Sequence, residues 1–140
     1  MFKFFKNNKD KTKPLASDDE SQKSDGLVQK TWGTVRTVHE DVPGHFEFRK
    51  IVVNPKSQTS LHRHLQRREY WYVANGGGTV ETSADPKLYK ETHTISKGQE
   101  IVINQGKWHR IVNNSDTQKL VIYEVAIGDI SEHDVERHLD

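Results

Sequence analysis

Apolar and polar residues alternate in short runs along most of the chain, beginning near Leu27. The runs are rich in β-branched and aromatic residues, and turn residues separate them. Alternation with a period of two predicts β-strands that bury one face. Strands are expected at HFEFRKIVVN (45–54), EYWYVA (69–74), TVETSA (79–84), KLYKETHTI (87–95), EIVINQG (100–106), WHRIVNN (108–114) and KLVIYEVAI (119–127).

Glycine and asparagine mark the predicted turns. Asn75 is followed by three glycines, a sequence that predicts a β-hairpin between the strands on either side. No helical pattern follows these glycines, which argues against a phosphate-binding loop. Only residues 131–139 look helical, with Ser131 as the N-cap and Arg137 and His138 in the last turn. These features predict an all-β sandwich or barrel with a short C-terminal helix.

The first 25 residues differ in composition from the rest. After a start that contains three phenylalanines, they are almost wholly Lys, Asp, Ser, Asn, Gln and Thr. Such a segment lacks the apolar periodicity needed to bury a face, so we expect a disordered tail at 1–25 and one folded domain at 26–140. Neither a secretory signal nor a membrane-spanning run is predicted. We therefore expect a cytoplasmic protein.

Charge and composition argue against several partners and sites. The chain has 21 Lys and Arg against 20 Asp and Glu, which gives a net charge of +1 at pH 7. This balance gives no reason to expect nucleic acid or a membrane as a partner. The sequence contains no cysteine, so disulfides and thiolate metal sites are excluded.

The stretch LHRHLQRREYW gathers residue types that bind metals. His62 and His64 share one face of a strand because side chains alternate, and Glu69 on the neighbouring strand can come up beside them. A second segment, GQEIVINQGKWHRIVNN, supplies His109. Three imidazoles and one carboxylate form a site for a divalent transition metal such as Zn, Mn, Fe, Co or Ni. Its open positions favour catalysis or ligand capture over a structural role.

These two segments resemble the paired motifs of the cupin superfamily, and the resemblance implies a double-stranded β-helix fold. The first motif is His-x-His, then Glu, then Gly; the second is Gly, Pro-x-Gly, His and Asn. Asn104 stands where the second motif usually has proline, and the leading glycine of the first motif, near Lys56, is absent. The matching residues are His62, His64, Glu69 and Gly76 in the first motif and Gly98, Gly106, His109 and Asn113 in the second.

A narrower resemblance covers most of residues 30–140. KTWGTVRTV, FRKIVVNPKSQTSLHRH, RREYW, GKWHRIVN, LVIYEVAIGD and HDVERHLD are similar to the type II mannose-6-phosphate isomerase domain, often fused to a mannose-1-phosphate guanylyltransferase. The resemblance implies a stand-alone domain with metal ligands His64, Glu69 and His109, and with His62 where the family commonly has glutamine. It also implies interconversion of mannose 6-phosphate and fructose 6-phosphate, which supplies GDP-mannose and polysaccharide synthesis.

Departures from the family bear on the substrate. Lys30 and Thr31 replace the Arg-Pro of its Arg-Pro-Trp-Gly, and Arg68 and Tyr70 replace the alanine and second histidine of Arg-Ala-Glu-His-Trp. The Tyr-Gly-Arg with which the family usually closes does not follow Asp140. None of these changes removes a predicted metal ligand, so the expected fold and metal site are unaffected.

Aldose–ketose isomerisation needs a Lewis acid for the sugar oxygens and a base that carries a proton between two carbons. Glu69 is committed to the metal, so Glu124 is the candidate base, with an ion pair to Arg or Lys as its alternative role. Arg137, which matches the family, is the second candidate catalytic residue. Phosphate binding needs cationic groups at the mouth of the site. The candidates are Arg49, Lys50, Arg67, Lys107, Arg110 and Arg137.

Two rival functions suit the same ligand set. Three histidines and a glutamate also fit an iron-dependent oxygenase of small molecules. The change at Tyr70 and the short end after the last motif favour a non-catalytic cupin that binds a sugar or nucleotide sugar. The long isomerase-like strings favour a sugar-phosphate isomerase. Because a small sandwich exposes strand edges, and because of the cupin resemblance, we expect a C2 homodimer formed through those edges.

Overall fold

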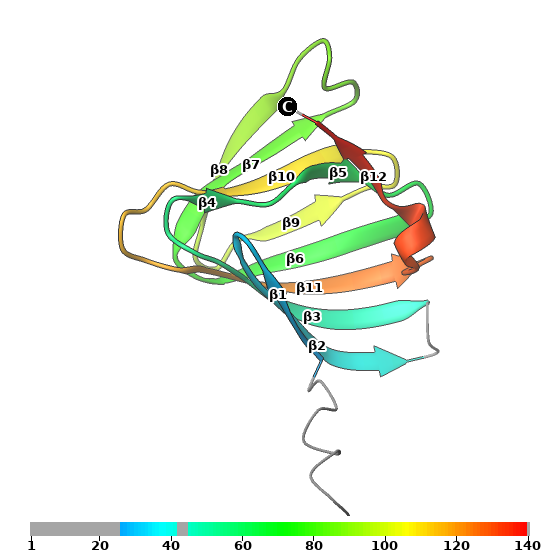
Figure 1. Cartoon of the computed structure of the whole chain (residues 1–140), viewed down its shortest axis with the longest axis horizontal. Helices are drawn as coiled ribbons and strands as arrows, with labels where there is room; N and C mark the ends of the chain where they lie inside the picture. The colour runs from blue at the N-terminus through cyan, green and yellow to red at the C-terminus, as the bar shows by residue number, and fades with distance from the viewer. Residues whose placement is uncertain (1–25, 42–44, 140) are drawn as a thin grey trace, which may run out of the picture.

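The computed structural model describes residues 26–41 and 45–139, which form two antiparallel sheets (Figure 1). The predicted tail at 1–25 lies outside these residues. The first sheet has the order β1 (Leu27–Lys30), β2 (Gly33–Asp41), β3 (Phe46–Val53), β11 (Leu120–Gly128), β6 (Arg67–Asn75) and β9 (Glu100–Ile103). The second has the order β12 (Glu136–His138), β5 (Leu61–Arg63), β10 (Trp108–Asn113), β7 (Gly77–Ser83) and β8 (Glu91–Ser96), with β4 (Ser57–Gln58) beside β10. The predicted all-β class is confirmed.

The space between the sheets is divided into an apolar end and a polar end. Along β6, Trp71 and Val73 belong to the apolar core, whereas Glu69 is buried among polar groups. Along β11, Ile122 lies in the core and Glu124 among the buried charged residues. Because every second residue points inward, one pair of strands contributes both to the core and to a buried polar site.

The predicted hairpin at Asn75 is wrong. β6 ends at Asn75 in the first sheet, and β7 begins at Gly77 in the second, so the two strands do not pair. Gly76 has φ of 75°, a left-handed conformation that glycine adopts without strain. A Cβ on Gly78 would lie 2.2 Å from the carbonyl oxygen of Val112. These glycines therefore allow the chain to cross from the first sheet to the second while its backbone packs closely against β10.

The predicted C-terminal helix at 131–139 is also wrong. Its first residues form a single 3₁₀ turn, η2 (Glu132–Asp134), and Ser131 makes no side-chain cap. The chain then continues as β12, which pairs antiparallel with β5 and places Arg137 opposite His62. Pairing with an open sheet edge gives this segment hydrogen bonds that the sequence pattern alone does not reveal. In the described part of the chain, no helix is long and apolar enough to span a membrane.

Candidate metal centre

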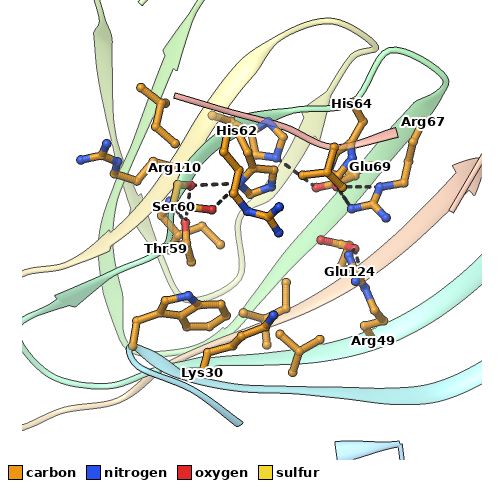
Figure 2. A pocket seen from close by; sticks show the side chains of 18 of the residues that line it. Lys30, Arg49, Thr59, Ser60, His62, His64, Arg67, Glu69, Arg110 and Glu124 are labelled. Atoms are coloured by element: carbon orange, nitrogen blue, oxygen red, sulfur yellow. Dashed lines mark hydrogen bonds and ion pairs between the residues drawn. The ribbon is translucent and has the colours of Figure 1, made fainter. Parts of the chain in front are cut away.

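Three histidines meet at the polar end of the interior. His109 on β10 lies opposite His62 on β5 in the strand register, and His64 follows β5 directly. Their ligand nitrogens all lie within 4.8 Å of one another. Figure 2 shows the labelled His62 and His64 beside Glu69. The structure thus brings together the three imidazoles that the sequence predicts as metal ligands.

Hydrogen bonds fix the proton of each imidazole on the side away from the centre. In each ring, Nδ1 lies 2.9 Å from a backbone carbonyl, and only a protonated nitrogen can donate to a carbonyl. The three acceptors are the carbonyls of Ser60, Asp134 and Lys107. Nε2 of each ring therefore carries a lone pair, which is the arrangement that metal-binding histidines require.

Nε2 of His109 gives the test of whether these residues suit a metal. This atom is buried and has no hydrogen-bond partner among the described residues. A buried polar atom without a partner is costly, and a lone pair that faces two other imidazoles can be satisfied by a cation. The donor set, all nitrogen and oxygen, fits a divalent transition metal.

Glu69 supplies an anionic group to the same centre. Its Oε1 lies 3.2 Å from Nε2 of His64, and its Oε2 lies 3.6 Å from Nε2 of His109. The carboxylate also accepts hydrogen bonds from Arg67, at 3.1 Å from Nε, and from the indole of Trp71, at 2.9 Å. Burial alone would raise the pKa of Glu69, but the nearby His64, His109 and Arg67 hold it well below its ordinary value. Glu69 is therefore ionised.

Two of the three histidines, His62 and His109, have pKa values below that of an ordinary imidazole. Burial, followed by the proximity of His109, lowers the pKa of His62 to about 3. Burial also lowers the pKa of His109 below its ordinary value. Since a protonated imidazole cannot bind a metal, these shifts keep both ligands in the binding form.

Asp134 fixes the loop that carries His64. Its backbone carbonyl accepts the hydrogen bond from Nδ1 of His64, and its carboxylate accepts two more from the backbone amides of Leu65 and Gln66, at 3.0 and 2.8 Å. The 3₁₀ turn is thereby attached to the ligand loop by three hydrogen bonds. Asp134 matches the family at its position, but the sequence pattern assigns it no role, because its contacts lie about seventy residues away in the chain.

Replacing Asp134 by alanine is expected to lower the affinity for Zn²⁺ by about 10- to 100-fold, the usual effect of losing an outer-shell partner. Without the carboxylate, two of the three hydrogen bonds between the turn and the loop are lost, and the backbone carbonyl that orients the ring of His64 is held less firmly. Competition with a chelating indicator measures the affinity. Asp116→Ala, which removes an exposed carboxylate paired with Lys56, is the control. Equal affinity in the two variants would show that Asp134 does not position the ligand.

The centre lies in the wall of a cavity of about 630 Å³ that contains more cationic than anionic side chains. Figure 2 shows Lys30 and Arg49 on the side of the cavity opposite the histidines. The charged residues of the lining are Lys30, Arg49, Arg67, Arg110 and Arg137, together with Glu47, Glu69 and Glu124. Five cationic groups against three carboxylates favour an anionic ligand.

Glu124 and Arg49 form a buried pair in the same cavity. They lie opposite each other on β11 and β3, and Arg49 donates to Oε1 of Glu124 through Nε, at 2.9 Å, and through a terminal nitrogen. Burial raises the pKa of Glu124, and the charge of Arg49 only partly opposes this. Burial lowers the pKa of Arg49, but Glu124 and Glu69 raise it above its ordinary value. Glu124 is thus both ion-paired and placed in the cavity.

The other predicted phosphate contacts divide into two groups. Arg67 and Arg137 line the cavity, whereas Lys50 and Lys107 are absent from its lining. Lys50 faces the outer side of β3, and Lys107 lies in the turn before β10. Arg110 also belongs to the cavity lining, but it is buried and its Nε lies 3.7 Å from a carboxylate oxygen of Glu81. Its side chain points away from the histidines in Figure 2.

Two residues that depart from the family motif Arg-Ala-Glu-His-Trp lie outside the site. One residue inside the site was not predicted. Arg68 and Tyr70 are exposed on the outer face of β6, because Arg67 and Glu69 occupy the inward positions. The substitution at Tyr70 therefore leaves the cavity unchanged. Lys30 lines the cavity although it was not among the predicted phosphate contacts; its place in the family-like segment Lys-Thr-Trp-Gly (30–33) was the signal for it.

Residues 17–140 match the family described as "Mannose-6-phosphate isomerase C-terminal". The chain belongs to this family. A similar protein is the alginate biosynthesis protein AlgA of Pseudomonas syringae pv. tomato, 31% identical over 114 residues. The match covers 81% of this chain and only 22% of AlgA, so the chain spans less than a quarter of that relative.

Solved structures confirm the predicted cupin fold. The capsular polysaccharide assembling protein CapF of Staphylococcus aureus superposes with a TM-score of 0.68 at 18% identity, over 84% of this chain and 33% of CapF. An uncharacterised protein of Klebsiella pneumoniae with a double-stranded β-helix domain gives a TM-score of 0.65 at 12% identity, over 81% of this chain and 90% of its own. The fold is therefore the double-stranded β-helix of the cupins.

Proposed function

We propose that this family member is a metal-dependent isomerase that interconverts mannose 6-phosphate and fructose 6-phosphate for polysaccharide synthesis. The observation that carries the proposal is the convergence of three imidazole lone pairs and the ionised Glu69 in a cavity rich in cationic side chains. Family membership supports a sugar phosphate as the ligand. The similarity to an alginate biosynthesis protein supports the link to polysaccharides.

The ligand residues would place a metal where two adjacent sugar oxygens can reach it. His62, His64, His109 and Glu69 would hold the ion, which would supply a Lewis acid for those oxygens. Arg67 and the indole of Trp71 keep the carboxylate of Glu69 in place. The burial of this region limits water around the reacting atoms.

Proton transfer is assigned to Glu124. Its carboxylate lies in the cavity lining and has a raised pKa, which makes it a stronger base than an exposed glutamate. Both hydrogen bonds from Arg49 end on Oε1, so we assign the proton to Oε2. In this mechanism Glu124 removes the proton from C2 of the open-chain aldose and returns it at C1, the hydroxyl proton passes from O2 to O1, and Arg49 holds the carboxylate in position.

The phosphate is assigned to the outer part of the cavity. Lys30 and Arg137 line it there, and both are exposed. Ammonium and guanidinium groups form strong charge-assisted hydrogen bonds with phosphate oxygens. Arg49 and Arg67 are engaged with carboxylates and are therefore less suited to this role.

A second candidate function is the binding of a sugar phosphate without catalysis. One contact favours it: a terminal nitrogen of Arg67 lies 2.6 Å from Nε2 of His64, the atom expected to bind the metal. An arginine that keeps this contact would compete with a cation for the lone pair. The cavity would then be a cationic pocket for an anionic ligand.

Metal-stripped protein supplied with each divalent metal in turn is expected to convert mannose 6-phosphate with at least one of them. In D₂O, deuterium should appear at C2 of the recovered mannose 6-phosphate, because the C2 proton exchanges with solvent on the base. Glu69→Gln should abolish turnover. If no metal supports turnover, and mannose 6-phosphate still raises the melting temperature, the binding function replaces the isomerase.

A further inference from the structure

The outer face of the first sheet carries a band of apolar side chains that the metal centre does not use. Arg49, Glu69 and Glu124 point into the cavity, so the residues next to them in β3, β6 and β11 point outward. These outward residues and those of β9 line a groove on the surface. We call this surface the aromatic face; it consists of Phe48, Tyr70, Tyr72, Val102, Tyr123 and Val125.

The strand register orders the aromatic face into two rows across β3, β11, β6 and β9. One row carries no charged residue and consists of Phe48, Val125, Tyr70 and Val102, with the hydroxyl of Tyr70 accepting a hydrogen bond from Arg68. The other consists of Lys50, Tyr123, Tyr72 and Glu100, so that it has a cation at one end and a carboxylate at the other. Arg36, opposite Lys50 on β2, adds to the positive end.

Three of the six side chains of the aromatic face are exposed, and the other three are half-buried. Tyr70 is 39% exposed, Tyr72 46% and Val102 50%. Contiguous apolar groups of this kind mark interaction sites, and tyrosine is enriched at protein interfaces. The face lies on the opposite side of the sheet from the cavity, so sugar-phosphate chemistry does not account for it.

We infer that the occupant is a second copy of this chain, because the charged row is complementary to itself. Consider two copies whose aromatic faces meet, related by a twofold axis. The axis lies in the plane between the two sheets, runs parallel to the strands, and passes over the space between β11 and β6. Rotation about it brings Lys50 opposite Glu100 of the partner subunit, and Glu100 opposite Lys50 of the partner subunit. Both ends of the row are thereby paired by a single operation, as an isologous contact requires.

The same axis also pairs the apolar residues. Tyr123 meets Tyr72 of the partner subunit, Val125 meets Tyr70 of the partner subunit, and Phe48 meets Val102 of the partner subunit. Face-to-face sheets pack about 10 Å apart, a distance that such side chains fill by interdigitating. The homodimer expected from the sequence is thus retained, but its interface is the face of a sheet and not a strand edge.

Sedimentation equilibrium at micromolar concentration tests this interface. The wild-type protein is expected to sediment with twice its chain mass of 16.2 kDa. Glu100→Lys places like charges opposite each other and should weaken the dimer at least tenfold. The double variant Lys50→Glu with Glu100→Lys restores the pairing and should recover most of the affinity. Glu91→Lys, the same charge change on an exposed strand of the second sheet, is the control and should leave the dimer intact.

Tyr72→Lys tests the centre of the interface independently of its ends. This variant should be monomeric while keeping the circular dichroism and metal content of the wild type, since Tyr72 contacts no part of the site. A monomeric wild-type protein would overturn the inference and leave the aromatic face to another partner, such as a stacked oligosaccharide. A dimer that survives both Glu100→Lys and Tyr72→Lys would overturn it as well, because its interface would lie elsewhere.

Discussion

The His109→Ala variant is expected to lose stoichiometric metal binding. Nε2 of His109 is buried, lacks a hydrogen-bond partner among the described residues, and faces His62 and His64. Without this nitrogen, only two imidazoles remain at the centre. The methyl group of alanine cannot bind a metal. Elemental analysis of protein loaded with Zn²⁺ and then dialysed measures the loss.

A control separates this loss from a general effect of removing a histidine. His93 lies on β8, and its side chain is 55% exposed. His93→Ala should therefore retain full metal content and a wild-type melting temperature. If His109→Ala retained full metal content, the three imidazoles would not form the metal centre, and the isomerase mechanism would lose its basis.

The Glu124→Gln variant is expected to lower kcat by about 10²- to 10⁴-fold, the usual contribution of a positioned base. The amide has the volume of the carboxylate and can still accept hydrogen bonds from Arg49, but it cannot take up a proton. Metal content should remain unchanged, because Glu124 is not one of the converging ligands. Steady-state kinetics with mannose 6-phosphate, together with metal analysis, test both parts.

Glu136→Gln is a matched control for this experiment. Glu136 is also a carboxylate paired with an arginine, since Arg63 donates to it at 2.9 Å, but it lies outside the cavity lining. Its replacement should leave kcat close to that of the wild type. A Glu124→Gln enzyme as fast as Glu136→Gln would reduce Glu124 to a structural partner of Arg49, and the base would have to be sought among other cavity residues.

The sequence could predict the strands and the ligand set because both depend on local patterns. Alternation along single strands identified β3 and β6 to β11 but not β1, β2, β4 or β12. The spacing of His62 and His64 placed two ligands on one face. The partnership of Arg49 with Glu124 could not be predicted in this way, because these residues lie 75 positions apart. Only the register of β3 against β11 brings them together.

The predictions of a hairpin at Asn75 and of a helix at 131–139 were wrong because each local sequence pattern is compatible with two different tertiary arrangements. An Asn-Gly pair suits a hairpin, but the strands on either side of Asn75 find better partners in different sheets. The segment after Ser131 has a helical pattern, but the edge of β5 was open, and pairing there satisfies the backbone of β12. From the sequence, Tyr70 was interpreted as a substitution within the site. Alternation along β6 instead places its side chain on the outer face of the sheet.

The contact between Asp134 and His64 sets the order in which the protein can mature. During synthesis, residues 62–109 leave the ribosome before Asp134, so the imidazoles emerge while one of them still lacks the carbonyl that orients it. Tight binding of an ion by the three imidazoles would therefore require that the segment carrying Asp134 has been made and has docked beside β5. Conversely, an ion held there would keep that segment in place, so the centre would couple metal binding to the docking of β12.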